Sequence, residues 1–328
     1  MTSTEPKIVV IGGGTGSFTL LSALKNHTKQ LTALVNMADD GGSTGLLRDE
    51  LGVLPPGDIR QCLVALSTAS DELRELFNYR FPKGTFGGHS FGNLFLSAVE
   101  SMTDDFSDAV RIAGDVLRIR GRVMPVTLDD CQLVLQDGGH KIKGQYDITY
   151  TERHLNGRPQ LSLEPQAALN PLAREAIAEA DLIILSPGNL YGSLAPALLV
   201  DGIAEALKNS PAQLVFVCNL VNKPQLTRDF AVHDYASEIE RFIGKDALDY
   251  VLYNNDEPEP ELLNTYALDE EFPVRVDLSA LEKAHYKTIA GQFLSRAPQQ
   301  GDANDTLIKR SLIRHDGEAV AEALLKLL

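Results

Sequence analysis

A glycine-rich segment close to the N-terminus constrains the fold of this chain more than any other feature. The apolar, mostly β-branched run Lys7–Ile11 leads directly into Gly12–Ser17, which reads Gly-Gly-Gly-Thr-Gly-Ser. Apolar residues at helical spacing follow, at Phe18, Leu21 and Leu24. A strand, a glycine-rich turn and a helix in this order open a parallel, doubly wound sheet. We therefore predict an α/β fold with a mainly parallel, Rossmann-like sheet.

The same segment, Gly12–Ser17, predicts a binding site for a phosphorylated nucleotide. Glycines let the backbone adopt positive φ and let a diphosphate approach closely, and the following helix directs N–H groups and partial positive charge at the anion. No Gly-Lys-Ser/Thr follows, so the segment is not a Walker A loop, and Ser17 replaces the third glycine of the dinucleotide fingerprint. Asn36 replaces the acid that binds the ribose of NAD. NAD is therefore a weaker alternative, and a tight turn without a ligand is another.

A second glycine-rich loop follows the next expected strand, Leu31–Asn36. It starts with Asp39 and Asp40 and continues through Gly41–Gly45. Ligands of α/β proteins bind at the carboxyl ends of parallel strands, and hard carboxylate oxygens suit a Mg²⁺ ion that bridges to a ligand phosphate. One carboxylate could instead act as a general base. An acidic turn that caps the next helix explains the same residues equally well.

Three further loops have the composition of ligand-binding turns. Pro55–Arg60 could place its arginine near a phosphate, although a rigid turn at the start of a helix explains the segment better. Gly87–Asn93 leads into another helix and contains His89. Ser186–Asn189 follows the buried strand expected at Leu182–Leu185. We expect this last loop at the same edge of the sheet as the first glycine-rich loop.

The rest of the chain is organised around one sheet. We predict a single nucleotide-binding domain over residues 1–328, interrupted by a β insertion at about residues 123–165. Within the insertion, Cys131–Gln136 and His140–Tyr150 are expected to pair as a hairpin. Asp316 is expected to cap a C-terminal helix. Further strands of the parallel sheet are expected at Leu214–Val217, Tyr250–Tyr253 and Val274–Val276.

Charge and composition restrict the partners of the chain. Its 30 basic and 45 acidic side chains leave a net charge of −15, which is a poor match for nucleic acid or an anionic membrane surface. The N-terminal residues lack the apolar core of a signal peptide, and no apolar run approaches the about 20 residues of a membrane helix. The three isolated cysteines lack zinc or disulfide spacing. We expect a cytoplasmic protein without nucleic-acid partner or membrane insertion; a homodimer stays open, and the sequence names no protein partner.

Taken together, these segments resemble the YvcK/CofD-like family. The residues that carry the resemblance are Ile11–Gly16, Asn36, Asp39–Gly45, Leu46–Arg48, Pro55–Arg60, Gly88–Asn93, Ser186–Asn189 and Leu312–Asp316. The Asp-Asp-Gly-Gly-Ser and Pro-Pro-Gly-Asp-Ile-Arg segments are similar to the YvcK branch, described as gluconeogenesis and cell-shape factors that bind UDP-sugars such as UDP-N-acetylglucosamine. The CofD branch is a Mg²⁺-dependent 2-phospho-L-lactate transferase.

The resemblance implies a regulatory UDP-sugar-binding protein without demonstrable catalysis. The alternative that it leaves open is a CofD-like transferase with Mg²⁺ on Asp39 and Asp40. It also implies that Tyr266 stacks on the uracil or the sugar and that Arg314 holds the diphosphate. The ligand-binding residues expected in total are Gly12, Gly13, Gly14, Thr15, Gly16, Ser17, Asn36, Asp40, Ser43, Arg60, Asn93, Pro187, Gly188, Asn189, Tyr266 and Arg314.

Overall fold

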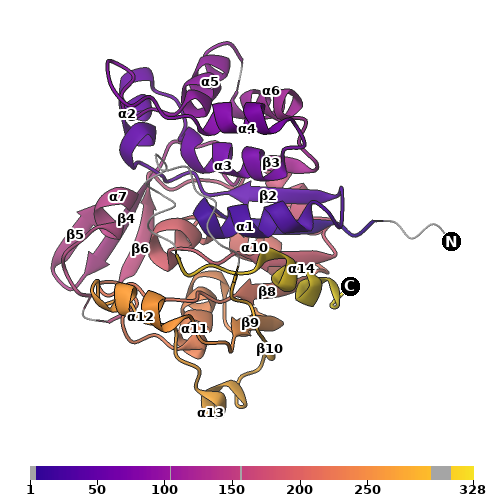
Figure 1. Cartoon of the computed structure of the whole chain (residues 1–328), viewed down its shortest axis with the longest axis vertical. Coiled ribbons are helices and arrows are strands. Elements are labelled where there is room, and N and C mark those ends of the chain that lie inside the picture. Colours follow the sequence, from indigo (N-terminus) through magenta and orange to yellow (C-terminus); the bar gives the residue numbers. More distant parts are fainter. Residues whose placement is uncertain (1–4, 104, 156, 297–311) are drawn as a thin grey trace.

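The main sheet has seven strands, all of them parallel, as the sequence predicts (Figure 1). The computed structural model describes residues 5–103, 105–155, 157–296 and 312–328. The strand order is β10-β9-β8-β7-β1-β2-β3. These strands are β1 (Ile8–Gly12), β2 (Leu31–Val35), β3 (Arg122–Pro125), β7 (Leu182–Leu185), β8 (Gln213–Val217), β9 (Tyr250–Asn254) and β10 (Lys287–Gly291).

Three central strands bring the glycine-rich loops together. Every residue of β1, β2 and β7 is buried, which suits continuous apolar runs covered on both faces of a parallel sheet. Ile11 of β1 is in register with Leu34 of β2 on one side and with Leu185 of β7 on the other. The loops that follow these strands therefore leave the sheet side by side at its carboxyl edge.

Helices cover both faces of the sheet. On one face α1 packs against α3 and α14, and on the other α10 packs against α8 and α11. Asp316 accepts hydrogen bonds from the backbone N–H groups of Glu318 and Ala319, which confirms the expected cap of α14. The helices are α1 (Gly14–Leu24), α2 (Gly42–Leu51), α3 (Pro56–Leu66), α4 (Asp71–Asn78), α5 (Phe91–Glu100), α6 (Phe106–Leu117), α7 (Gln145–Thr149), α8 (Pro171–Ala178), the π-helix η1 (Leu190–Leu194), α9 (Ala195–Leu198), α10 (Ile203–Asn209), α11 (Val232–Ile243), α12 (Pro260–Ala267), α13 (Leu278–Leu281) and α14 (Gly317–Leu325).

The insertion is a small antiparallel sheet with one helix. Its strands β4 (Gln132–Asp137), β5 (His140–Lys143) and β6 (Gln160–Glu164) have the order β5-β4-β6. The hairpin prediction is confirmed for β4 and β5, but the second strand ends at Lys143 and α7 follows, so its extension to Tyr150 was wrong. Gly144 has a φ of 106°, and this turn of the backbone ends the strand. In Figure 1 this small sheet and α7 lie on the left.

Two strand boundaries also differ from the sequence-based expectation. Residues 123–125 belong to β3 of the main sheet rather than to the insertion, because they pair with β2. Val274–Val276 is not a strand; only isolated bridges at Pro273 and Arg275 occur there. The final strand of the sheet is β10, and its residues are exposed or half-buried. Without a buried apolar run, an edge strand of this kind gives only a weak sequence signal.

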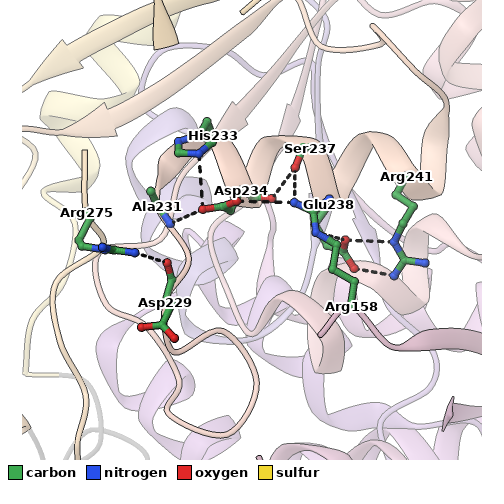
Figure 2. A network of polar contacts seen from close by, with 9 residues as sticks. All are labelled: Arg158, Asp229, Ala231, His233, Asp234, Ser237, Glu238, Arg241 and Arg275. Atoms are coloured by element: carbon green, nitrogen blue, oxygen red, sulfur yellow. Dashed lines mark hydrogen bonds and ion pairs between the residues drawn. The ribbon is translucent and has the colours of Figure 1, made fainter. Parts of the chain in front are cut away.

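Charged side chains fasten the insertion to α11 (Figure 2). Glu238 of α11 is fully buried and accepts two hydrogen bonds from Arg241, at 3.0 and 2.5 Å. Arg158, which precedes β6, donates to Ser237 at 2.6 Å and lies 3.5 Å from Glu238. Arg241 also donates to the backbone carbonyl of Pro159 at 2.7 Å. A buried carboxylate needs such partners, and here they tie the insertion to the main domain.

Cys62, Cys131 and Cys218 are free thiols, and all three are buried. Within the described ranges, no helix combines the length and apolar character needed to cross a membrane.

Candidate functional site

Two loops at the carboxyl edge of the sheet, the glycine-rich loop after β1 and the loop after β7, are in direct contact. A Cβ placed on Gly16 would lie 1.9 Å from the carbonyl oxygen of Pro187, so only glycine allows this approach. The hydroxyl oxygens of Ser17 and Ser186 are 2.7 Å apart and buried. The carbonyl of Gly188 accepts a hydrogen bond of 2.5 Å from the side-chain amide of Asn219. The expectation that these loops share one edge of the sheet is therefore confirmed.

Gly14 borders open space at the amino end of α1. Its φ is 67°, and among the described residues no atom from beyond its own helix and its chain neighbours lies within 4 Å of the position that its Cβ would occupy. Its backbone N–H donates a hydrogen bond of 3.1 Å to Oδ1 of Asp58. Gly13, just before it, approaches the same carboxylate so closely that a Cβ there would lie 2.1 Å from Oδ2. The glycine loop therefore packs against an acid of α3 that the sequence analysis did not include in the site.

Asp58 and Asp39 form a pair of neighbouring, half-buried carboxyl groups. Asp39 accepts a hydrogen bond of 3.1 Å from the backbone of Gly41, and its Oδ2 packs against Gly57. Burial, with the Asp39 charge beside it, raises the pKa of Asp58 to about 7, and burial also raises the pKa of Asp39. Neighbouring carboxyl groups with raised pKa values are typical of functional sites.

Asp40 points away from this pair. Its two carboxylate oxygens accept hydrogen bonds from the backbone N–H groups of Gln145, at 3.1 Å, and Tyr146, at 2.7 Å. It thereby caps the amino end of α7, where negative charge is stabilising. The adjacent acids Asp39 and Asp40 thus have different roles, and Asp58 lies beside Asp39, where a metal-binding partner was expected from Asp40.

Ser43, Arg60 and Asn93 meet in a buried polar network. Asn93 donates to the hydroxyl of Ser43 at 3.2 Å, and Ser43 is 3.0 Å from Nδ1 of His89. Arg60 donates to Asn93 at 3.0 Å and also to Asn78. Arg60 is only 5% exposed. This network joins α2, α3 and α5. Its residues therefore support the loops that precede these helices from the buried side.

Two asparagines form hydrogen bonds in the loops that follow β2 and β7. Asn36 is 1% exposed, and its Oδ1 accepts a hydrogen bond of 2.9 Å from the backbone of Ala38. Its Nδ2 is buried without a hydrogen-bond partner within the described part of the chain. Asn189 caps η1 by accepting from Gly192 at 3.1 Å, and its amide donates to Thr149 at 3.0 Å. Asn36 therefore keeps a donor for a ligand or a water, whereas Asn189 joins the third loop to α7.

Tyr266 is placed for anchoring rather than for stacking. Its ring is 7% exposed and packs in an apolar cluster with Leu220, Leu294 and Ile313. Its hydroxyl accepts hydrogen bonds from the backbone N–H groups of Leu312, at 2.7 Å, and Ile313, at 3.0 Å. These bonds hold the segment that leads to the half-buried Arg314.

We expect Tyr266→Phe to separate the two roles. Phenylalanine would preserve a stacking ring, but it removes the acceptor of two backbone N–H groups. We therefore expect the variant to lose about 1–3 kcal/mol in free energy of unfolding, measured by urea denaturation. Tyr79→Phe, at a 50% exposed ring, serves as the matched control. Unchanged stability of Tyr266→Phe would contradict the anchoring role.

A cavity of about 610 Å³ lies away from these loops. It is bordered by α6 and the residues around β3, including Arg111, Arg118 and Arg122. Arg111 forms ion pairs with Asp108 and Asp115 on its own helix. The cavity contains no residue of the three loops at the carboxyl ends of β1, β2 and β7, and so we place the candidate site at those loops.

The fold and these loops define an α/β protein with a glycine-rich loop at the end of a central parallel strand. A family model described as "2-phospho-L-lactate transferase CofD" matches residues 8–294, and the chain belongs to this family. It is 40% identical to a "Putative gluconeogenesis factor" of Thermoanaerobacterium thermosulfurigenes, over 98% of this chain and 97% of that protein. The "Gluconeogenesis factor" of Bacillus subtilis is 36% identical, over 99% and 98%.

A solved structure has the same fold over its whole length. Protein BH3568 from Bacillus halodurans is 34% identical and superposes with a TM-score of 0.90, covering 98% of this chain and 100% of that one. A second crystal structure of BH3568 is titled a member of the UPF0052 family. The predicted relationship to the YvcK/CofD-like family is therefore confirmed.

Proposed function

We propose that this chain is a regulatory protein of carbon metabolism that binds a nucleotide sugar of the UDP-N-acetylglucosamine type. The observation that carries the proposal is that three loops leave the sheet side by side at the carboxyl ends of β1, β2 and β7, and that no distant atom of the described residues lies within 4 Å of the Cβ position of Gly14. The gluconeogenesis-factor names of the relatives support the metabolic role.

Each part of the site has a task in this proposal. The amino end of α1 supplies N–H groups and partial positive charge for the diphosphate, and Gly14 leaves room for it. Arg314 adds positive charge from the segment that Tyr266 anchors. The Nδ2 of Asn36, which is buried and has no hydrogen-bond partner among the described residues, would donate to an oxygen of the ligand. NAD fits less well, because Asn36 stands where an acid would bind its ribose.

The second candidate function is a Mg²⁺-dependent transfer of phospholactate. The neighbouring side chains of Asp39 and Asp58 favour it, because two adjacent carboxylates, once deprotonated, offer oxygen ligands for a divalent cation. A bound Mg²⁺ would neutralise charge on a phosphate. Asp39 and Asp58 would hold that ion, whereas Asp40 is occupied at α7.

A titration distinguishes the two functions. We expect UDP-N-acetylglucosamine at 100 times its dissociation constant to stabilise the protein by about 2.7 kcal/mol, with or without EDTA. GDP, GTP and NAD form the comparison panel. If none of these nucleotides binds, the proposal is wrong.

Transfer is tested with phospholactyl-guanosine diphosphate and a deazaflavin acceptor. We expect no product. Mg²⁺-dependent transfer that is lost in Asp58→Asn and retained in the matched Asp40→Asn would instead establish the transferase.

A further inference from the structure

Helix α7 and the residue that directly follows it expose two tyrosine rings beside the candidate site. Tyr146 and Tyr150 lie one helical turn apart, and their ring centroids are 4.6 Å apart with the planes tilted by 49°. They are 48% and 49% exposed. Ile148, on the same short helix, is fully buried and attaches it to the core. The two large rings therefore remain on the outer side of a helix that already has its own core contact.

Contacts on both sides fix α7 at the carboxyl edge of the sheet. Asp40 caps its amino end, and Thr149 accepts a hydrogen bond from Asn189 in the loop after β7. Cδ2 of Tyr146 lies 3.4 Å from the position that a Cβ on Gly41 would occupy. The rings thus lie next to the loop that follows β2, and α7 is also hydrogen-bonded to the loop that follows β7.

A continuous series of contacts leads from the glycine loop to these rings. Gly14 bonds to Asp58, and Gly57, which directly precedes Asp58, packs against Oδ2 of Asp39. Asp39 bonds to Gly41, and Gly41 adjoins Tyr146. A ligand with a diphosphate at the amino end of α1 and a flat ring at its other end could extend along this series.

We propose that Tyr146 and Tyr150 form the platform on which the base of the nucleotide ligand stacks. This inference rests on the proposed function, and it assigns to α7 the stacking role that the buried ring of Tyr266 does not fill. Exposed aromatic faces stack on any nucleobase, because every base has a π-face. The network of Arg158, Glu238 and Arg241 in Figure 2 fastens the insertion, so the platform is held in place before the ligand binds.

Calorimetric titration of the full-length protein tests the platform. The probes are UDP-N-acetylglucosamine and inorganic pyrophosphate, which has no base. We expect Tyr146→Ala and Tyr150→Ala each to weaken binding of the sugar nucleotide about tenfold. Pyrophosphate affinity should stay within about twofold, and the Phe variants at both positions should retain sugar-nucleotide binding. Tyr79→Ala, with a ring of similar exposure directly after α4, is the matched control.

The outcomes separate this inference from the proposed function. If the unmodified protein binds UDP-N-acetylglucosamine but both alanine variants bind it equally well, the platform is wrong and the proposed function stands. If an alanine variant loses pyrophosphate affinity to the same extent, the tyrosines act on the phosphate loop and the stacking role is wrong. If the unmodified protein binds no nucleotide, both are wrong.

Discussion

Gly16→Ala is expected to lower the free energy of unfolding by about 3 kcal/mol, because its methyl group has no space. The added Cβ would lie 1.9 Å from the carbonyl oxygen of Pro187 and 2.7 Å from its carbonyl carbon. These are backbone atoms, so a side-chain rotation cannot relieve the clash. The glycine loop and the loop after β7 must therefore move apart, and we expect nucleotide affinity to fall at least tenfold with them. Urea denaturation and calorimetric titration measure the two effects.

The matched control lies on the facing loop. A Cβ on Gly188 would have neighbours no closer than 3.8 Å, and this residue does not have a positive φ. We therefore expect Gly188→Ala to change stability by less than about 0.5 kcal/mol, as an ordinary substitution without a clash does. Equal stability of the two variants would show that the close contact between the loops is absent in solution.

We expect Asp58→Asn to stabilise the protein at pH 8. The pKa of Asp58 rises from 3.8 to about 7 on folding, through burial and then the Asp39 charge, so the folded state binds a proton that the unfolded state releases. Stability that depends on this proton is present below pH 4 and is lost as the pH rises to about 7. Each unit of pKa shift corresponds to about 1.4 kcal/mol, so the gain at pH 8 should amount to a few kcal/mol.

Denaturation curves at pH 4, 6 and 8 check this prediction. We expect the stability of the unmodified protein to fall between pH 4 and 7 and the slope to flatten in Asp58→Asn. The amide still accepts the hydrogen bond from Gly14, so the local contact is preserved. Asp39→Asn should move this loss of stability to lower pH, because removal of the neighbouring charge lowers the pKa of Asp58. A slope that is identical in all three proteins would refute the raised pKa of Asp58.

Features encoded within short segments were predictable from the sequence. The buried runs of β1 and β7 and the glycines after β1 are local signals, because a parallel strand covered on both faces must be continuously apolar. The cap at Asp316 is equally local, since its partners lie two and three residues further on. The common edge of the loops also followed, because parallel strands end on the same side of a sheet.

Only the tertiary structure decided which side chains face one another. Asp39 and Asp40 are neighbours in sequence, yet one lies beside Asp58 of α3 and the other caps α7, more than a hundred residues away. No local pattern encodes a partner at such a separation. The same holds for Tyr266, whose buried hydroxyl binds the backbone of Leu312 and Ile313. Periodicity reports which face of an element is buried, but the position of that element against distant ones depends on packing of the whole core.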